Sequence, residues 1–367
     1  MHERYQTNNM QHIDYMAYVD SFAKTKDTKS RLTHGALELC PKPLITIAIP
    51  TYKRPGLLKI ALDSALNQNV PGCQYEVLVV DNEFSPQQAS ETAELIKQRN
   101  QNANLLYYQN VENLGIAGNW NRCIQLARGE WVAFLHDDDI LIPDYVAKIR
   151  RLMQKRKDAD GIMALCFMMH EGEGAKEAAM RKPVRAVTRA YDKLSVNKLM
   201  RLRQSDSAIK ISNVYGAPTC GSIFRRDSLM ASGGFNDSYH PSFDWLFLYR
   251  FCSKYKLYRS MERLGYYRVF ANVSLLDKTK DAFMRDRINF VDYSASHSRL
   301  GSALRRLFAN EQNNTILNEE YSDYAGKAAG DYFQASEIKV RKTRLLIYRL
   351  ATQGYWHMKS VICLIFG

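Results

Sequence analysis

One stretch of the sequence constrains the fold more than any other. The apolar residues 131–135 are followed by His136 and by three consecutive aspartates, Asp137, Asp138 and Asp139. Such an apolar run is typical of a strand that is buried on both faces of a sheet. Three adjacent carboxylates repel one another, so a fold keeps them together only where positive charge compensates them. The stretch therefore predicts a site for a hard divalent ion at the end of a buried strand, with a solvated acidic turn as the alternative.

Three further apolar runs precede this one, and helical patterns separate them. Strands are predicted at residues 44–49, 75–80 and 105–108, and helices near 55–66, 87–99 and 117–127. This alternation is typical of an α/β fold with a mostly parallel sheet flanked by helices. Because ligands bind at the carboxyl ends of the strands in such sheets, the polar residues that follow the strands are predicted to converge on one edge.

The composition limits the class of protein and its partners. The chain has 367 residues and a formal net charge of +13, which favours anionic partners without choosing among nucleotides, lipid surfaces and nucleic acid. Its seven cysteines are scattered and odd in number, which favours a reducing cytoplasm over a disulfide framework. Residues 1–20 lack the apolar core of a signal peptide, and no apolar run reaches the ~20 residues of a spanning helix. We therefore expect a cytoplasmic protein that is at most attached to a membrane face.

Three regions are expected along the chain: an extension over residues 1–42, an α/β domain over 43–275 and a helical region over 276–367. In the last region, basic residues from Lys339 onwards precede Tyr355, Trp356 and an apolar end. This order suits a helix that lies on an anionic bilayer. A helix docked on the domain, or in a homodimer interface, is the alternative. The basic segment 171–193 is expected to form a loop that is either solvated or close to the substrate.

The order of the motifs resembles the family 2 (GT2) inverting glycosyltransferases of the bacterial surface-polysaccharide type. The matching motifs are residues 47–55, 79–82, 112–115, 126–139, 233–235 and 243–245. The resemblance implies a GT-A fold, which is Rossmann-like and typical of nucleotide-diphospho-sugar transferases, followed by a C-terminal helical extension. It also implies transfer of a sugar from a UDP-sugar with the help of Mn²⁺ or Mg²⁺ held at a DXD motif.

The resemblance also assigns roles to residues of this chain. The expected nucleotide-binding residues are Pro50, Thr51, Tyr52, Arg54, Asp81, Asp137 and Arg268; the metal ligands are Asp138 and Asp139; the catalytic base is Asp244; and the residues near the transferred sugar or acceptor are Gly221, Ser222 and Trp245. His136 stands where the family usually has the first acid of the DXD motif, so it is either a ligand itself or a residue that orients one. Asp244 has an alternative role as a helix N-cap.

The acceptor is expected to be a saccharide linked to polyprenyl diphosphate, as in O-antigen, lipopolysaccharide or capsule synthesis. The protein would then lie peripherally at the inner face of the cytoplasmic membrane. Transfer to a soluble or protein acceptor is the alternative within enzymes. A non-catalytic nucleotide or nucleic-acid binder is the alternative outside them, but no basic motif interleaved with aromatic residues supports nucleic-acid binding.

Overall fold

The computed structural model describes residues 14–70, 74–83, 90–99, 104–170, 172, 174, 193–204, 219–269, 277–297, 299–315 and 341–366. The basic segment expected at 171–193 lies outside the described residues except for Gly172, Gly174 and Lys193, and Lys339 lies outside them as well.

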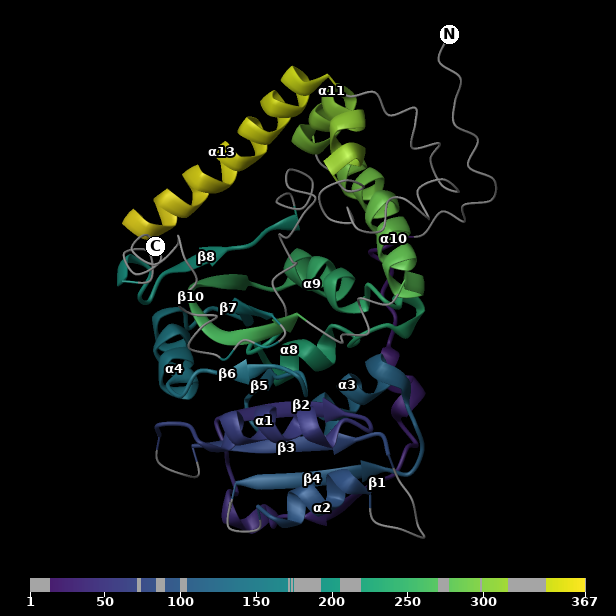
Figure 1. The fold of residues 1–367 in the computed structure, drawn as a ribbon, viewed down its shortest axis with the longest axis vertical. Helices are drawn as coiled ribbons and strands as arrows, with labels where there is room; N and C mark the ends of the chain where they lie inside the picture. The colour runs from purple at the N-terminus through teal and green to yellow at the C-terminus, as the bar shows by residue number, and fades with distance from the viewer. Residues whose placement is uncertain are drawn as a thin grey trace.

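The centre of the described part is a ten-stranded mixed sheet (Figure 1). The strand order is β1-β4-β3-β2-β5-β9-β7-β10-β6, and β8 pairs with β10 beside this path. The strands are β1 (Ser30–His34), β2 (Ile45–Thr51), β3 (Tyr75–Asp81), β4 (Leu105–Asn110), β5 (Trp131–Phe134), β6 (Ile140–Leu141), β7 (Gly161–His170), β8 (Leu199–Arg201), β9 (Ile223–Arg225) and β10 (Leu257–Val269).

The first half of the sheet is parallel, as the apolar runs predict. Strands β4, β3, β2 and β5 lie side by side in parallel register, so Thr51 and Asp81 face each other at the strand ends. In the second half, β9 runs antiparallel to both β5 and β7, while β10 runs parallel to β7. The expected α/β fold is confirmed, with antiparallel strands added beyond β5.

Helices cover both faces of this sheet. They are α1 (Pro55–Leu66), α2 (Glu91–Lys97), α3 (Gly115–Leu126), α4 (Tyr145–Lys155), α8 (Arg226–Ala231) and α9 (Phe243–Lys254). Alternate residues of β2 point to opposite faces: Ile47 and Ile49 pack in the core under α1, α2 and α4, whereas Ala48 packs in the core under α3, α8 and α9. The first proline of the 55–66 pattern occupies the start of α1, where its missing N–H costs nothing.

The C-terminal region is helical, as expected. It comprises α10 (Asp277–Ser296), α11 (Arg299–Thr315) and α13 (Lys342–Phe366), and in Figure 1 α13 runs from α11 to the end of β8. Helix α10 contacts α11, and α13 contacts α11 and β8. Among the described residues, none of the helices combines the length and the apolar character required to cross a bilayer.

The residues before β2 pack closely on the rest of the chain. Strand β1 pairs with β4 and forms one edge of the sheet, although no strand is predicted there from the sequence. The short 3₁₀ helices η1 (Ser21–Thr25) and η2 (Leu37–Leu39) flank it. The ring of Tyr15 lies 6.0 Å from that of Tyr239, in the 3₁₀ helix η3 (Asp237–Tyr239), and 5.6 and 5.0 Å from Phe290 and Tyr293 of α10. This aromatic cluster joins the start of the described chain to α10.

Candidate active site

A cavity of about 450 Å³ opens at the carboxyl ends of β2, β3 and β5. Small-molecule sites typically span about 300–1,000 Å³, so the cavity has the size of a ligand site. Seven of the residues predicted for the site line it: Pro50, Thr51, Tyr52, Arg54, Asp137, Asp138 and Asp244. The structure therefore brings the end of β2, the aspartates after β5 and the start of α9 to one place.

Arg54 bridges two of the three consecutive aspartates. Its Nη1 donates to Asp137 Oδ1 at 2.8 Å and its Nη2 donates to Asp138 Oδ2 at 2.7 Å. Lys53 has a φ of 53°, a left-handed conformation that turns the chain immediately before Arg54. Thr51 also donates to Asp137, through Oγ1 to Oδ2 at 2.9 Å. The loop after β2 thus supplies the positive charge that adjacent carboxylates require.

Burial makes this compensation necessary. The side chains of Asp137 and Asp138 are only 7% and 8% exposed, against 30% for Arg54. Burial raises the pKa of Asp137 to about 6, and the charge of Arg54 opposes that rise. The interpretation of the acids as a solvated turn is therefore wrong, because all three aspartates are buried.

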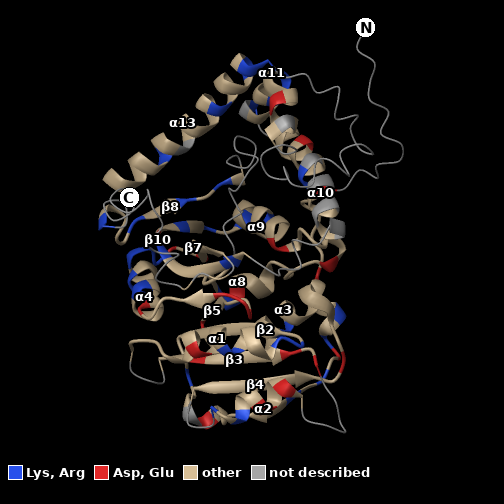
Figure 2. Ribbon diagram, in the orientation of Figure 1, with Lys and Arg blue, Asp and Glu red and all other residues tan. Residues whose placement is uncertain are grey.

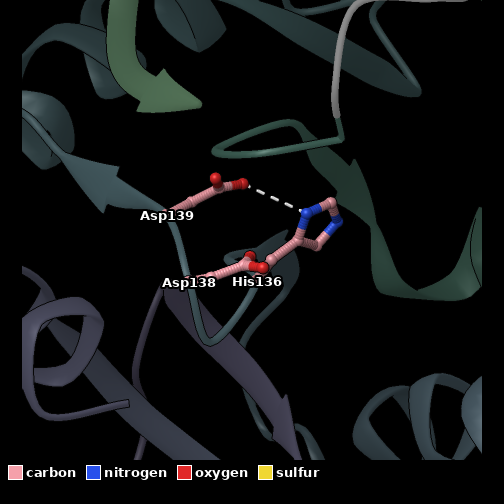
Figure 3. A group of neighbouring side chains, drawn as sticks. All are labelled: His136, Asp138 and Asp139. Atoms are coloured by element: carbon pink, nitrogen blue, oxygen red, sulfur yellow. Dashed lines mark ion pairs between the residues drawn. The ribbon is translucent and has the colours of Figure 1, made fainter. Parts of the chain in front are cut away.

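His136 and Asp139 form the other half of the acidic segment (Figure 3). His136 Nδ1 lies 3.1 Å from Asp139 Oδ2, and His136 Nε2 lies 2.7 Å from Thr219 Oγ1. Burial opposes charge on the imidazole, but the Asp139 carboxylate outweighs it and raises the pKa of His136 to about 9. The backbone N–H of Arg268 donates to Asp139 Oδ1 at 2.9 Å. Thr219, in the segment before β9, and Arg268, near the end of β10, therefore hold this pair.

The donor set at this segment fits a divalent cation. One ligand atom each from His136, Asp138 and Asp139 lies within 4.8 Å of the others. One imidazole nitrogen and two carboxylate oxygens suit Mn²⁺, provided that the ion displaces the His136 proton, and the carboxylates alone suit Mg²⁺. The structure thus groups His136 with the two predicted ligands. Asp138 has Arg54 as its partner and Asp139 has His136, so the same carboxylates already attract cationic groups.

Asp244 lies across the cavity in the first turn of α9. Its Oδ1 accepts a hydrogen bond from the N–H of Trp245 at 2.7 Å, so the carboxylate interacts with its own helix terminus. Burial nevertheless raises its pKa, with the Trp245 N–H and the charge of His136 acting in the opposite direction. The N-cap position of α9 belongs to Ser242, and Asp244 is free to face the cavity that it lines.

Six of the residues predicted for the site do not line this cavity: Asp81, Asp139, Gly221, Ser222, Trp245 and Arg268. Asp81 is fully buried, where its carboxylate accepts from Tyr107 Oη at 2.7 Å and from the N–H of Glu83 at 2.9 Å. Burial raises the pKa of Asp81 to about 7. Arg268 is 6% exposed and reaches the site through its backbone N–H on Asp139. Both residues therefore lie behind the cavity wall.

The three residues predicted near the transferred sugar or acceptor have packing contacts instead. Gly221 has a φ of +66° and its carbonyl accepts from Tyr145 Oη at 2.7 Å, while the buried Ser222 Oγ accepts from the N–H of Ala164 at 3.2 Å. Trp245 packs edge-on against Phe290 of α10, with ring centroids 4.3 Å apart. Their contacts shape the surroundings of the site, and their expected contact with substrate stays a prediction.

Comparison with known proteins places the chain in a family. The family model for Glycosyl transferase family 2 matches residues 46–232, about half of the chain. The chain belongs to this family. The matched part contains the β2 loop and the four residues His136–Asp139, whereas Asp244 and α10 lie beyond it.

Relatives of this family 2 chain include two bacterial enzymes. It is 30% identical over 176 residues to the abequosyltransferase RfbV of Salmonella typhimurium, covering 47% of this chain and 50% of RfbV. It is 31% identical over 137 residues to the GalNAc(5)-diNAcBac-PP-undecaprenol β-1,3-glucosyltransferase of Campylobacter jejuni, covering 37% and 42%. The chain thus spans about half the length of these curated relatives.

The fold has a counterpart among solved structures. S. aureus TarS (residues 1–349), crystallised with UDP-GlcNAc, superposes with a TM-score of 0.52 at 16% sequence identity, covering 84% of this chain and 81% of TarS. A likeness at this identity supports the GT-A architecture of this family 2 chain and carries no statement about its ligands.

Several cavity-lining residues were missed by sequence reasoning. They are Asn82, Asn113, Gly115, Ile116, Asn119, Trp120, His240, Pro241, Phe243, Tyr267, Thr279 and Phe283; His136, which also lines the cavity, was expected there from the sequence. Asn119 is the most informative: its Nδ2 donates to the carbonyl of Val80 at 3.0 Å and its Oδ1 accepts from Asn110 at 3.0 Å. A buried asparagine inside an amphipathic helix is a signal that could have been used. Thr279 and Phe283 come from α10, and nothing local in the sequence ties that helix to the site.

Proposed function

We propose that this chain is an inverting glycosyltransferase that moves a sugar from a nucleotide diphosphate to an acceptor hydroxyl. The single observation that carries the proposal is the shared cavity, because Asp138 and Asp244, far apart in sequence, both line it. Direct displacement with inversion needs the leaving group and the base on opposite sides of the sugar. Two acids supplied by different elements, one after β5 and one at the start of α9, suit that requirement.

Asp244 is the proposed general base. A carboxylate whose pKa burial raises above its ordinary value takes up a proton more readily than an exposed one. It would accept the proton of the acceptor hydroxyl as the oxygen attacks the anomeric carbon, a contribution of about 10²–10⁴-fold in rate. The hydrogen bond from the Trp245 N–H fixes the orientation of the carboxylate.

Asp138 and Asp139, with His136, are the residues that would hold Mn²⁺ or Mg²⁺. When bound, the ion neutralises the charge that develops on the departing diphosphate. Arg54 and Thr51, together with Asp137, hold the neighbouring loop in place and would orient the diphosphate and ribose. A UDP-sugar is the proposed donor: TarS, which has the same fold, was crystallised with UDP-GlcNAc, and the screen described below tests this choice for the present chain.

The proposed acceptor is a saccharide linked to polyprenyl diphosphate. Support comes from the Campylobacter relative, whose name specifies an undecaprenyl-diphosphate-linked glycan, and from the net charge of +13, which favours an anionic partner. O-antigen or capsule synthesis at the inner face of the cytoplasmic membrane would require such a reaction. A soluble or protein acceptor, with a C-terminal dimer, is the alternative that the following experiment distinguishes.

The experiment is a screen of nucleotide sugars for metal-dependent release of UDP, followed by acceptor assays with lipid-linked and soluble saccharides. We expect release with one UDP-sugar and Mn²⁺, transfer only to the lipid-linked acceptor, and a product of inverted anomeric configuration by NMR. Asp244→Asn should retain UDP affinity and lose turnover, whereas Asp138→Ala should weaken both. Asp237→Asn is the matched control because Asp237 is exposed and does not line the cavity. Undiminished transfer by Asp244→Asn would refute the assignment of the base.

A further inference from the structure

Helix α13 carries a stripe of exposed apolar side chains. Its members are Leu346, Ile347, Leu350, Met358, Val361, Ile362 and Ile365, each between 51% and 61% exposed. At 3.6 residues per turn these positions fall within about 160° of the helix circumference and extend over about 28 Å of its length. Scattered apolar residues on a surface need no explanation, but a continuous stripe on one helix face indicates an interaction surface.

The opposite side of the helix is the side that packs on the protein. Tyr348, Thr352 and Cys363 are 4%, 8% and 6% exposed. The ring of Tyr348 lies 5.7 Å from that of Phe308 in α11, and Arg344 Nε donates to Glu311 Oε1 of the same helix at 2.8 Å. These contacts fix the rotation of α13 about its axis, so that the apolar stripe faces away from the protein.

The charges of α13 identify the kind of partner. Between Lys342 and Phe366 there are four basic residues, Lys342, Arg344, Arg349 and Lys359, and no aspartate or glutamate. Figure 2 shows basic positions and no acidic ones along this helix. Pairing of α13 with the same helix of a second copy would bring like charges together. A bilayer with anionic head groups offers both the apolar interior that the stripe needs and the negative charge that the basic residues need.

We infer that α13 is an interfacial anchor that lies in the head-group layer of an anionic bilayer with its apolar stripe toward the acyl chains. The inferred membrane contact is argued from the residues of α13 alone. Its purpose, access to a lipid-linked acceptor, rests on the proposed function. Helix α13 contacts α11, α11 contacts α10, and α10 supplies Thr279 and Phe283 to the cavity wall. Docking of α13 would therefore tether the protein that carries the cavity to the membrane in which a lipid-linked acceptor diffuses.

The test is vesicle flotation with the full chain. The wild type should float with mixed phosphatidylcholine–phosphatidylglycerol vesicles, less in high salt, and remain unbound with pure phosphatidylcholine. Ile362→Glu should lower the partition coefficient about tenfold or more, because the stripe would carry a charge into the apolar layer. Ile60→Glu is the matched control, since Ile60 is 42% exposed on α1, away from α13.

Each outcome decides the inference. Equal binding of wild type and Ile362→Glu, or equal binding to neutral and anionic vesicles, would overturn it. A wild-type dimer by light scattering that Ile362→Glu converts to a monomer, without vesicle binding, would make the stripe a subunit interface instead. Release of UDP, measured without vesicles, tests the transferase activity independently of membrane binding. Absence of vesicle binding by the wild type with intact UDP release rejects the anchor alone, and vesicle binding by the wild type without UDP release rejects the transferase alone.

Discussion

Arg54 is the residue whose removal should reveal how the aspartate segment is stabilised. In Arg54→Ala, the carboxylates of Asp137 and Asp138 lose the guanidinium that lies 2.8 and 2.7 Å away and remain buried without it. Loss of one partner from a fully buried ion pair costs about 3–5 kcal/mol. The side chain of Arg54 is 30% exposed, and water screens part of the loss. We therefore expect the free energy of unfolding to fall by about 2–3 kcal/mol, between the values for exposed and buried pairs.

The assay is thermal unfolding without added metal. A loss of this size should lower the midpoint by about 3–4 °C, because the entropy of unfolding is about 2.1 cal/mol/K per residue over 367 residues. Lys97→Ala is the control, because Lys97 and Glu94 form an exposed pair at 2.6 Å with side chains 63% and 56% exposed. Its midpoint should change by no more than about 2 °C, since exposed pairs contribute about 0–1 kcal/mol.

A double-mutant cycle tests the cause of the loss. When Asp137→Asn and Asp138→Asn are already present, Arg54→Ala should cost less than about 0.5 kcal/mol, because no buried charge then depends on the guanidinium. Excess Mn²⁺ should raise the midpoint of Arg54→Ala more than that of the wild type, since the cation no longer competes with Arg54. The reasoning is refuted if the cost of Arg54→Ala equals that of Lys97→Ala, or if it is undiminished in the Asn background.

Three further predictions concern residues in or behind the cavity wall. The pKa of Asp81 is raised from 3.8 to about 7, so between these values the unfolded chain has released a proton that the folded protein keeps, and the free energy of unfolding falls as pH rises. Asp81→Asn should remove up to about 4 kcal/mol of this pH dependence, measured by denaturation at pH 4.5 and pH 7.5. The affinity for UDP should be unchanged if Asp81 makes no contact with the uracil ring. Gly221→Ala should lower the free energy of unfolding by about 2 kcal/mol, because φ is +66° and the new Cβ would lie 3.0 Å from Leu141 Cδ2. Gly56→Ala in α1 is the control: its new Cβ would meet nothing within 4 Å, so it should stabilise the protein slightly. Asn119→Ala should cost about 2 kcal/mol by denaturation, because the Val80 carbonyl and the Asn110 amide each lose one buried hydrogen bond. A cost below that of Lys97→Ala would contradict the role of this buried network.

The parallel half of the sheet could be predicted because its signals are local. Each of β2, β3 and β5 is a run of apolar residues followed by polar ones, and the rule for strand ends then brings Thr51 and the aspartates together without knowledge of any contact. Strand β1 carries no such signal, since its residues are half-exposed or exposed and it forms only by pairing with β4. Strand β6 has two residues and depends on β10 in the same way.

The acidic residues of the candidate site could be predicted from the sequence, whereas many of the other residues that line the cavity could not. The proposed sugar transfer requires carboxylates such as Asp138 and Asp244. The predicted strand end and helix start indicate where these two residues lie in the fold. Whether a side chain faces the cavity depends on tertiary contacts, and for this reason Trp245, next to Asp244, packs on Phe290 instead. Thr279 and Phe283 reach the cavity only because α10 folds back across the domain, which no local pattern encodes.

The Tyr15 cluster connects residues near the start of the described chain to η3 and α10. Tyr15 touches Tyr239, immediately before the cavity residue His240, and two rings of α10, the helix that carries Phe283. The residues before β1 thus link η3 and α10, and the residues at these two elements line different parts of the candidate site. Removal of the residues before β1 would leave the aspartates of the candidate site in the chain. It would remove the Tyr15 contacts that join two parts of the cavity wall, so the wall would be less rigid.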